Sequence, residues 1–291
     1  MRKFIYFALG SFFLVISLAI FNINHQVTPA IASDYAHYMA QAHKNDRPVP
    51  TDIIAEAPKI EVVGEMVSYA EIDGEMVSGY ISRPVGVEEA LPGVILIHEW
   101  WGLNDNIKAM TDKMAAEGYV ALAVDLYKGK SAENPDQAME LVQRAIASGP
   151  ELENNLKQAY DYLKNQENTP KIASMGWCFG GLWSLNTALL LPTQLDATVI
   201  YYGGNITTDP EKLATLEMPI LGIFGELDQN PSVELVQEFE QVLKSLNKDV
   251  EIHIYENADH AFANSSGNRY NPEAAQDAWK KTTEFLTTHL Q

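Results

Sequence analysis

The sequence of 291 residues contains one cysteine, Cys178, which excludes an internal disulfide and any metal site made of several thiolates. Positive charge is also scarce: 20 Lys and Arg residues stand against 39 Asp and Glu residues, and the net charge is −19 at pH 7. Clustered Lys and Arg residues bind nucleic-acid phosphates, so a nucleic-acid partner is not expected. Internal repeats and low-complexity tracts are absent. The apolar content of 46% can supply a full core, and the composition favours a protein that acts on small molecules.

A long hydrophobic run lies at the N-terminus, where residues 4–21 are apolar apart from Ser and Gly. Two positive charges precede the run, and an A-x-A pattern at 30–32 follows it, which is the layout of a secretory signal peptide. We therefore predict a signal peptide over residues 1–32 and an exported protein, periplasmic or extracellular, that begins at Ser33. The alternative is an uncleaved membrane anchor formed by residues 4–21. After cleavage no membrane contact is expected.

The remaining chain divides into two parts. Residues 33–58 are polar and contain three prolines, which predicts an N-terminal extension on the surface. Residues 59–291 are long enough for one domain. Its first two strands, at 60–70 and 75–84, are predicted to form a hairpin around an Asp-Gly turn.

Short apolar runs alternate with amphipathic stretches in the rest of the domain. The predicted strands lie at 93–97, 120–127, 172–175, 197–202, 219–224 and 250–255, and the predicted helices at 106–117, 134–147, 151–165, 182–189, 232–246 and 272–289. This alternation predicts the α/β class, with a doubly wound, mostly parallel sheet and helices on both faces. Ligands bind such sheets at the carboxyl ends of the strands.

The stretch that organises the domain is 171–190, KIASMGWCFGGLWSLNTALL. An apolar run leads into Gly-x-Cys-x-Gly and then into a helix-like spacing, which is typical of the nucleophile elbow. Glycines two positions before and two after the cysteine remove Cβ atoms that would clash on so tight a turn. The alternative is a small buried hydrophobe, as most free cysteines are. The elbow favours Cys178 as a nucleophile.

Candidate partners of the thiol follow two later strands. The order Cys178, Asp228, His260 is that of nucleophile, acid and base in the α/β-hydrolase fold. A thiol needs a base to become a thiolate, and the base needs a carboxylate to fix its tautomer. Glu226 is the alternative acid, and we prefer Asp228 because it lies further into the loop.

Five of the seven histidines are set aside as the base by their position: His25, His37, His43, His253 and His289. His260 follows the last strand, where the base of this fold lies, and the alternative is an ordinary loop histidine. His98 is expected only to shape its loop. It does not open a zinc-binding H-E-x-x-H helix, because Gly102 stands at the second histidine position, and no metal is expected.

The oxyanion hole should consist of two backbone N–H groups. One is that of Phe179, directly after the nucleophile, and the other comes from the loop after the strand at 93–97, where Trp100 is the best candidate.

Together these motifs resemble the dienelactone hydrolase (carboxymethylenebutenolidase) family over about residues 58–290. The matching stretches are 98–104 (HEWWGLN), 125–127 (DLY), 176–181 (GWCFGG), 225–228 (GELD) and 259–262 (DHAF). The resemblance implies a Cys178–His260–Asp228 triad that opens an enol-lactone through an acyl-thioester, without a cofactor.

The resemblance also implies a second carboxylate, carried here by Glu99, which meets the thiol and helps to form the thiolate when substrate binds. An ionised carboxylate beside a thiol disfavours the thiolate, so activation by substrate is physically reasonable.

The sequence departs from the family at two arginines that hold the substrate carboxylate. Gly129 stands at one position, between Lys128 and Lys130, and Asn264 stands at the other. The departure predicts a preference for neutral substrates. The residues predicted to line the pocket are Trp101, Tyr127, Lys128 and Asn264.

The sequence therefore predicts an exported, monomeric hydrolase of small esters or lactones. One alternative is a thioesterase or small-peptide hydrolase that uses the same triad. Another is a binding protein of the same fold without turnover, against which the complete triad and Glu99 argue.

Overall fold

The computed structural model describes residues 39, 41, 43, 44 and 60–291. The predicted signal peptide or anchor lies outside the described residues, as does most of the predicted extension. Within the described part of the chain, none of the helices has the length and apolar character needed to cross a membrane.

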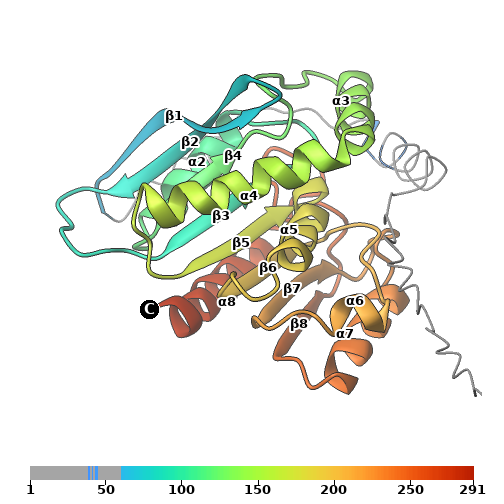
Figure 1. Ribbon diagram of the computed structural model, residues 1–291. Coiled ribbons are helices and arrows are strands. Elements are labelled where there is room, and N and C mark those ends of the chain that lie inside the picture. The colour runs from blue at the N-terminus through green and yellow to red at the C-terminus, as the bar shows by residue number, and fades with distance from the viewer. Residues whose placement is uncertain (1–38, 40, 42, 45–59) are drawn as a thin grey trace, which may run out of the picture.

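In the described residues one eight-stranded sheet forms the centre of the domain (Figure 1). Its strands are β1 (Val62–Ile72), β2 (Glu75–Pro84), β3 (Gly93–Ile97), β4 (Val120–Val124), β5 (Ile172–Trp177), β6 (Ala197–Tyr201), β7 (Ile220–Gly225) and β8 (Val250–Tyr255). Their spatial order is β1-β2-β4-β3-β5-β6-β7-β8. β1 and β2 pair antiparallel, β2 also pairs antiparallel with β4, and the strands from β3 onward pair in parallel. The predicted mostly parallel sheet is confirmed.

The predicted hairpin joins β1 to β2 through a two-residue turn. Asp73 and Gly74 have φ angles of 54° and 80°, and Ile72 pairs with Glu75 across the turn. Positive φ at both central residues is the type I′ geometry that Asp-Gly favours. The turn predicted from the Asp-Gly pair is therefore confirmed.

The helices described between and after the strands are α2 (Asp105–Ala115), α3 (Pro135–Ala147), α4 (Gly149–Asn165), α5 (Phe179–Leu190), α6 (Pro210–Leu213), α7 (Val233–Ser245) and α8 (Pro272–Leu290). Several begin at a side-chain cap, such as Asn134, whose oxygen accepts from the N–H of Gln137. The break predicted at residues 148–150 is confined to Ser148, because proline is tolerated in the first turn of a helix.

Helices cover both faces of the sheet, as predicted. α4 and α5 pack on the face nearer the viewer in Figure 1, and α2 and α8 pack on the other face. All residues of β3, β4, β5, β6 and β7 are buried, which accounts for their continuous apolar runs. Because these strands are parallel, the loops that follow them gather at one edge of the sheet.

β4 is shorter than predicted and ends at Val124 instead of residue 127. The carboxylate of Asp125 accepts hydrogen bonds from the backbone N–H groups of Tyr127, at 2.8 Å, and Gly129. This side chain therefore turns the chain before the strand can continue.

Candidate active site

Cys178 stands on a strained turn between β5 and α5. Its φ and ψ angles are 57° and −116°, a conformation that residues with a side chain rarely adopt. A Cβ atom added at Gly176 would lie 2.1 Å from the carbonyl oxygen of Gly180. One added at Gly180 would lie 2.1 Å from the carbonyl oxygen of Ile97. The two glycines are thus required by close backbone approach, as the sequence predicted, and the thiol is held at the end of the sheet.

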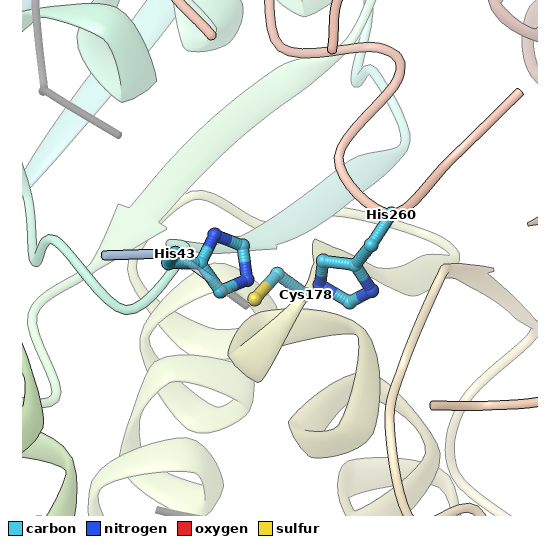
Figure 2. Close-up of side chains that lie close together, drawn as sticks. All are labelled: His43, Cys178 and His260. Carbon is cyan, nitrogen blue, oxygen red and sulfur yellow. The ribbon is translucent and has the colours of Figure 1, made fainter. Parts of the chain in front are cut away.

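His260 and Asp228 form a buried pair at the same edge of the sheet. Nδ1 of His260 lies 2.7 Å from Oδ2 of Asp228. Burial alone lowers the pKa of His260, but the negative charges of Asp228 and Cys178 outweigh it and raise the pKa well above its usual value. Nδ1 therefore carries a proton toward the carboxylate, and Nε2 is turned toward the sulfur of Cys178 (Figure 2).

The alternative acid, Glu226, and the other strand-end histidine, His98, both form hydrogen bonds away from the Asp228–His260 pair. Glu226 is exposed, and its carboxylate accepts from the backbone N–H of Asn257 at 3.0 Å. Nδ1 of His98 donates to the carbonyl oxygen of Glu99 at 2.6 Å, and its Nε2 accepts from the N–H of Leu126 at 3.2 Å. Burial lowers the pKa of His98. With both ring nitrogens engaged by backbone, His98 shapes its loop.

The loop after β3 lies against the first turn of α5, beside the thiol. Glu99 in this loop is buried, and its Oε2 accepts from Nδ2 of Asn264 at 2.7 Å. Trp100 is buried as well, and its carbonyl oxygen accepts from the hydroxyl of Tyr127 at 3.1 Å. Phe179 opens α5, and the N–H of a first helical residue has no intrahelical carbonyl to bond. The loop approaches the start of α5 closely, since a Cβ atom added at Gly180 would lie 2.6 Å from the carbonyl oxygen of His98.

The residues predicted to line the pocket have different surroundings. Lys128 forms an ion pair with Glu151 on α4, and with Lys130 it lines a cavity of about 250 Å³ whose lining does not include the thiol. Trp101 is buried against Trp100, with ring centroids 4.8 Å apart. Asn264 is engaged by Glu99, as described above. The predicted role of Lys128 as a pocket residue stays a prediction, and its ammonium group is paired with Glu151 on α4.

His43 is a site residue that the sequence analysis missed. Its side chain is 2% exposed, and its ring centroid lies 5.0 Å from that of His260 and 4.8 Å from that of Trp100. A ring nitrogen of His43, the sulfur of Cys178 and a ring nitrogen of His260 all lie within 4.8 Å of one another. Figure 2 shows the sulfur between the two imidazole rings. These three residues carry atoms of the kind that bind metal ions.

The N–H of His43 donates to the carbonyl oxygen of Met39 at 3.0 Å, and Met39 is also buried. Two residues of the predicted surface extension are thus buried. No motif or periodicity in this polar stretch marks His43, because its ring contacts Trp100, His260 and Arg269, which are distant in sequence.

Tyr202 is a second residue that was missed, although the strand-end rule covers its position directly after β6. Its ring centroid lies 5.3 Å from that of His260, and its buried hydroxyl has no hydrogen-bond partner among the described residues. Burial, followed by the negative charges of Glu99 and Cys178, raises the pKa of Tyr202 well above its usual value. Tyr202 therefore stays a neutral hydroxyl close to the thiol.

The strand order, the elbow after β5 and the residues after β7 and β8 define the α/β-hydrolase fold. A provisionally named dienelactone hydrolase from Klebsiella pneumoniae subsp. pneumoniae has the same fold. Its crystal structure superposes with a TM-score of 0.70 at 24% sequence identity, over 78% of this chain and 99% of that chain.

Sequence comparison identifies the family. The model of the dienelactone hydrolase family matches residues 77–290. Protein usf of Aquifex pyrophilus is 35% identical over 78% of this chain and 100% of its own length. A protein of Aquifex aeolicus (strain VF5), provisionally named carboxymethylenebutenolidase, is 32% identical over 79% of this chain and 100% of its own length. The chain belongs to the dienelactone hydrolase family, and the resemblance stated from its motifs is confirmed.

Proposed function

We propose that this protein hydrolyses small esters or lactones with Cys178 as nucleophile, His260 as base and Asp228 as the carboxylate that orients the base. The observation that carries the proposal is a lone thiol on a strained elbow, facing Nε2 of a histidine whose Nδ1 is held by a buried carboxylate. This is the arrangement of an activated nucleophile with an oriented base.

The reaction follows from these positions. His260 takes the thiol proton at Nε2, and the sulfur of Cys178 attacks the substrate carbonyl carbon to give a tetrahedral oxyanion. The N–H groups of Phe179 and Trp100 are the proposed donors to that oxyanion. Breaking the C–O bond leaves an acyl-thioester, and the departing oxygen takes the proton from Nε2. His260 then removes a proton from water, which attacks the thioester, releases the acid and returns the thiol.

Glu99 is proposed to restrain the thiol until substrate binds. While ionised, a carboxylate close to a thiol disfavours the thiolate. The hydrogen bond from Asn264 supports this role, because it holds Oε2 of Glu99 in one orientation.

The decisive experiment is a panel of neutral esters, lactones, thioesters and small peptides with Cys178→Ala as the blank. Turnover of esters or lactones by the wild type and none by Cys178→Ala is expected. Cys178→Ser should be a much weaker enzyme, because the site is arranged for a thiol and an alcohol is far harder to ionise. Full esterase activity in Cys178→Ala would refute the proposed nucleophile, and faster turnover of thioesters or peptides would change the substrate class.

We further propose that neutral substrates are preferred over carboxylated lactones. Lys128 is paired with Glu151, Asn264 with Glu99, and Gly129 carries no side chain, so none of these positions offers a guanidinium fork to a carboxylate. A net charge of −19 also opposes the approach of an anion.

The preference should reach about tenfold in kcat/KM. The measurement compares one carboxylated lactone with its methyl ester at low and moderate salt. A preference for the free carboxylate at both salts would contradict the proposal and point to another cation, and Arg269, which lies 2.7 Å from His43, is the first to test.

We also propose that residues 1–32 direct export and that the mature protein is a monomer without a cofactor. Mass spectrometry of the exported protein should find Ser33 as the first residue. A membrane-bound product that retains Met1 would instead make residues 4–21 an anchor. Light scattering of the purified protein tests the monomer.

A further inference from the structure

Two imidazole rings flank the sulfur of Cys178, and partners of opposite charge hold them. Nδ1 of His260 faces the carboxylate of Asp228 at 2.7 Å. Nδ1 of His43 instead lies 2.7 Å from Nη2 of Arg269. Nδ1 of His260 therefore faces a hydrogen-bond acceptor, whereas Nδ1 of His43 faces a hydrogen-bond donor.

The partner of His43 sets the position of its proton. An arginine guanidinium has only N–H donors and stays protonated, so it donates to Nδ1 of His43 and Nδ1 must accept. A neutral imidazole that accepts at Nδ1 carries its proton on Nε2. His260 has the reverse tautomer, with the proton on Nδ1, because a carboxylate can only accept.

The orientation of the rings puts both Nε2 atoms on the side of the thiol. Figure 2 shows that in each ring the nitrogen next to the attachment carbon points away from the sulfur and the other nitrogen faces it. The facing atoms of the three residues lie within 4.8 Å of one another. Nε2 of His260, which exchanges the thiol proton, and an N–H on His43 thus face the same sulfur from two sides.

We propose that His43 donates a hydrogen bond from Nε2–H to the thiolate of Cys178, and that Arg269 is the positioning residue that fixes the donor tautomer. This inference rests on the proposed function only in taking Cys178 as the reacting thiol. His260 moves the proton in this arrangement, whereas His43 stabilises the charge that remains on sulfur. A hydrogen bond to the charged form lowers the pKa of the thiol.

A transition-metal site is the competing interpretation, since a thiolate and two imidazoles are ligands that suit Zn²⁺. A histidine that ligates through one nitrogen usually donates its other N–H to a carboxylate or a carbonyl. His260 has such a partner in Asp228, but His43 has a cationic donor, which leaves no lone pair on Nε2. Metal binding through His43 is therefore an outcome that would contradict the donor assignment.

The test is the pH dependence of alkylation of the intact protein by iodoacetamide. Cys178 is the only cysteine, so the rate reports on one thiol and needs no turnover. His43→Ala should raise the thiol pKa by about one unit and slow alkylation near neutral pH about tenfold, with little change at high pH. An unchanged pH profile would overturn the proposal.

Two further substitutions at His43 form a matched pair. The amide nitrogen of Gln reaches about as far as Nε2 of His, whereas that of Asn ends near Nδ1. His43→Gln should therefore restore most of the rate lost in His43→Ala, and His43→Asn should not. Equal rates for Gln and Asn, in proteins with unchanged circular dichroism and Tm, would show that His43 only fills space.

The role of Arg269 is tested by a double-mutant cycle. Arg269→Met should raise the thiol pKa in the wild type and have little further effect in His43→Ala, because Arg269 acts through His43. Additive effects would mean that Arg269 acts by its charge alone and would overturn the tautomer assignment.

Metal binding completes the test. A Co²⁺–thiolate absorption band that is present in the wild type and lost in His43→Ala would also overturn the donor assignment, because it requires a lone pair on His43. If Cys178→Ala kept full esterase activity while His43→Ala still shifted the alkylation profile, the proposed function would fail and the hydrogen bond would stand.

Discussion

The strain at the nucleophile elbow can be measured without any substrate. Replacing Cys178 by Ala keeps the Cβ atom and the unfavourable backbone angles, φ 57° and ψ −116°, whereas replacing it by Gly relieves them. A side-chain-bearing residue held in such a conformation costs about 1–3 kcal/mol. Changing a buried Ala to Gly at an unstrained position costs about 0.8 kcal/mol for the lost methyl group and about 0.4–1 kcal/mol for the freer unfolded chain. At position 178 the relief of backbone strain on changing Ala to Gly opposes the usual cost of that change.

The control for this comparison is Ala173, which lies on β5 and is 0% exposed. Ala173→Gly should show the full cost of the change, because its strand conformation suits alanine. The step from Cys178→Ala to Cys178→Gly should cost about 1–3 kcal/mol less than Ala173→Gly, and it can be close to neutral. Urea unfolding at equal m-values measures both steps. Equal costs at the two positions would refute the idea that the fold holds the elbow under strain.

Other consequences of the site concern its buried carboxylates. Asp228→Asn should lower kcat/KM by about 100-fold or more, through a misoriented imidazole, whereas the exposed Glu226→Gln should have little effect. The reverse result would mean that Glu226 is the acid. Because the folded-state pKa of His260 is raised, its pairing adds stability that is fully present below the ordinary pKa of about 6.5 and is lost as pH rises through the folded value. Asp228→Asn should therefore lower the Tm more at about pH 6 than at about pH 10, and an equal drop at both would contradict the shift. Asn264→Leu should cost about 1–3 kcal/mol of unfolding free energy at neutral pH, and adding Glu99→Gln should recover part of it. An unchanged cost in the double variant would show that the Asn264–Glu99 bond does not matter to stability.

Most of the fold could be predicted because its signals are local. A few neighbouring residues are enough to predict each element. This holds for the two-residue Asp-Gly turn, the five buried apolar strands and the capped amphipathic helices. The parallel sheet then follows from the alternation of strands and helices. The element that the sequence misplaced, the end of β4, depends on the side chain of Asp125, which bonds the backbone beyond it.

The sequence also predicted which residues would approach the thiol from the strand ends. Cys178 lies between glycines whose absent Cβ atoms are required by backbone contacts of 2.1 Å. Asp228 and His260 follow neighbouring strands of a parallel sheet, so their loops open at the same edge. Chain order and sheet geometry were enough to bring these three together.

What only the tertiary structure decided is the set of partners that surrounds them. Lys128 is paired with Glu151, and Asn264 with Glu99, which turns two expected substrate contacts into internal ones. His43 and Arg269 stand 226 positions apart in sequence, yet a 2.7 Å contact joins them beside the thiol. Periodicity and motifs describe neighbours along the chain, whereas these pairs depend on how distant segments pack. The sequence by itself therefore determined the fold and the elbow that carries Cys178, and the packing decided which charges and hydrogen bonds surround the sulfur.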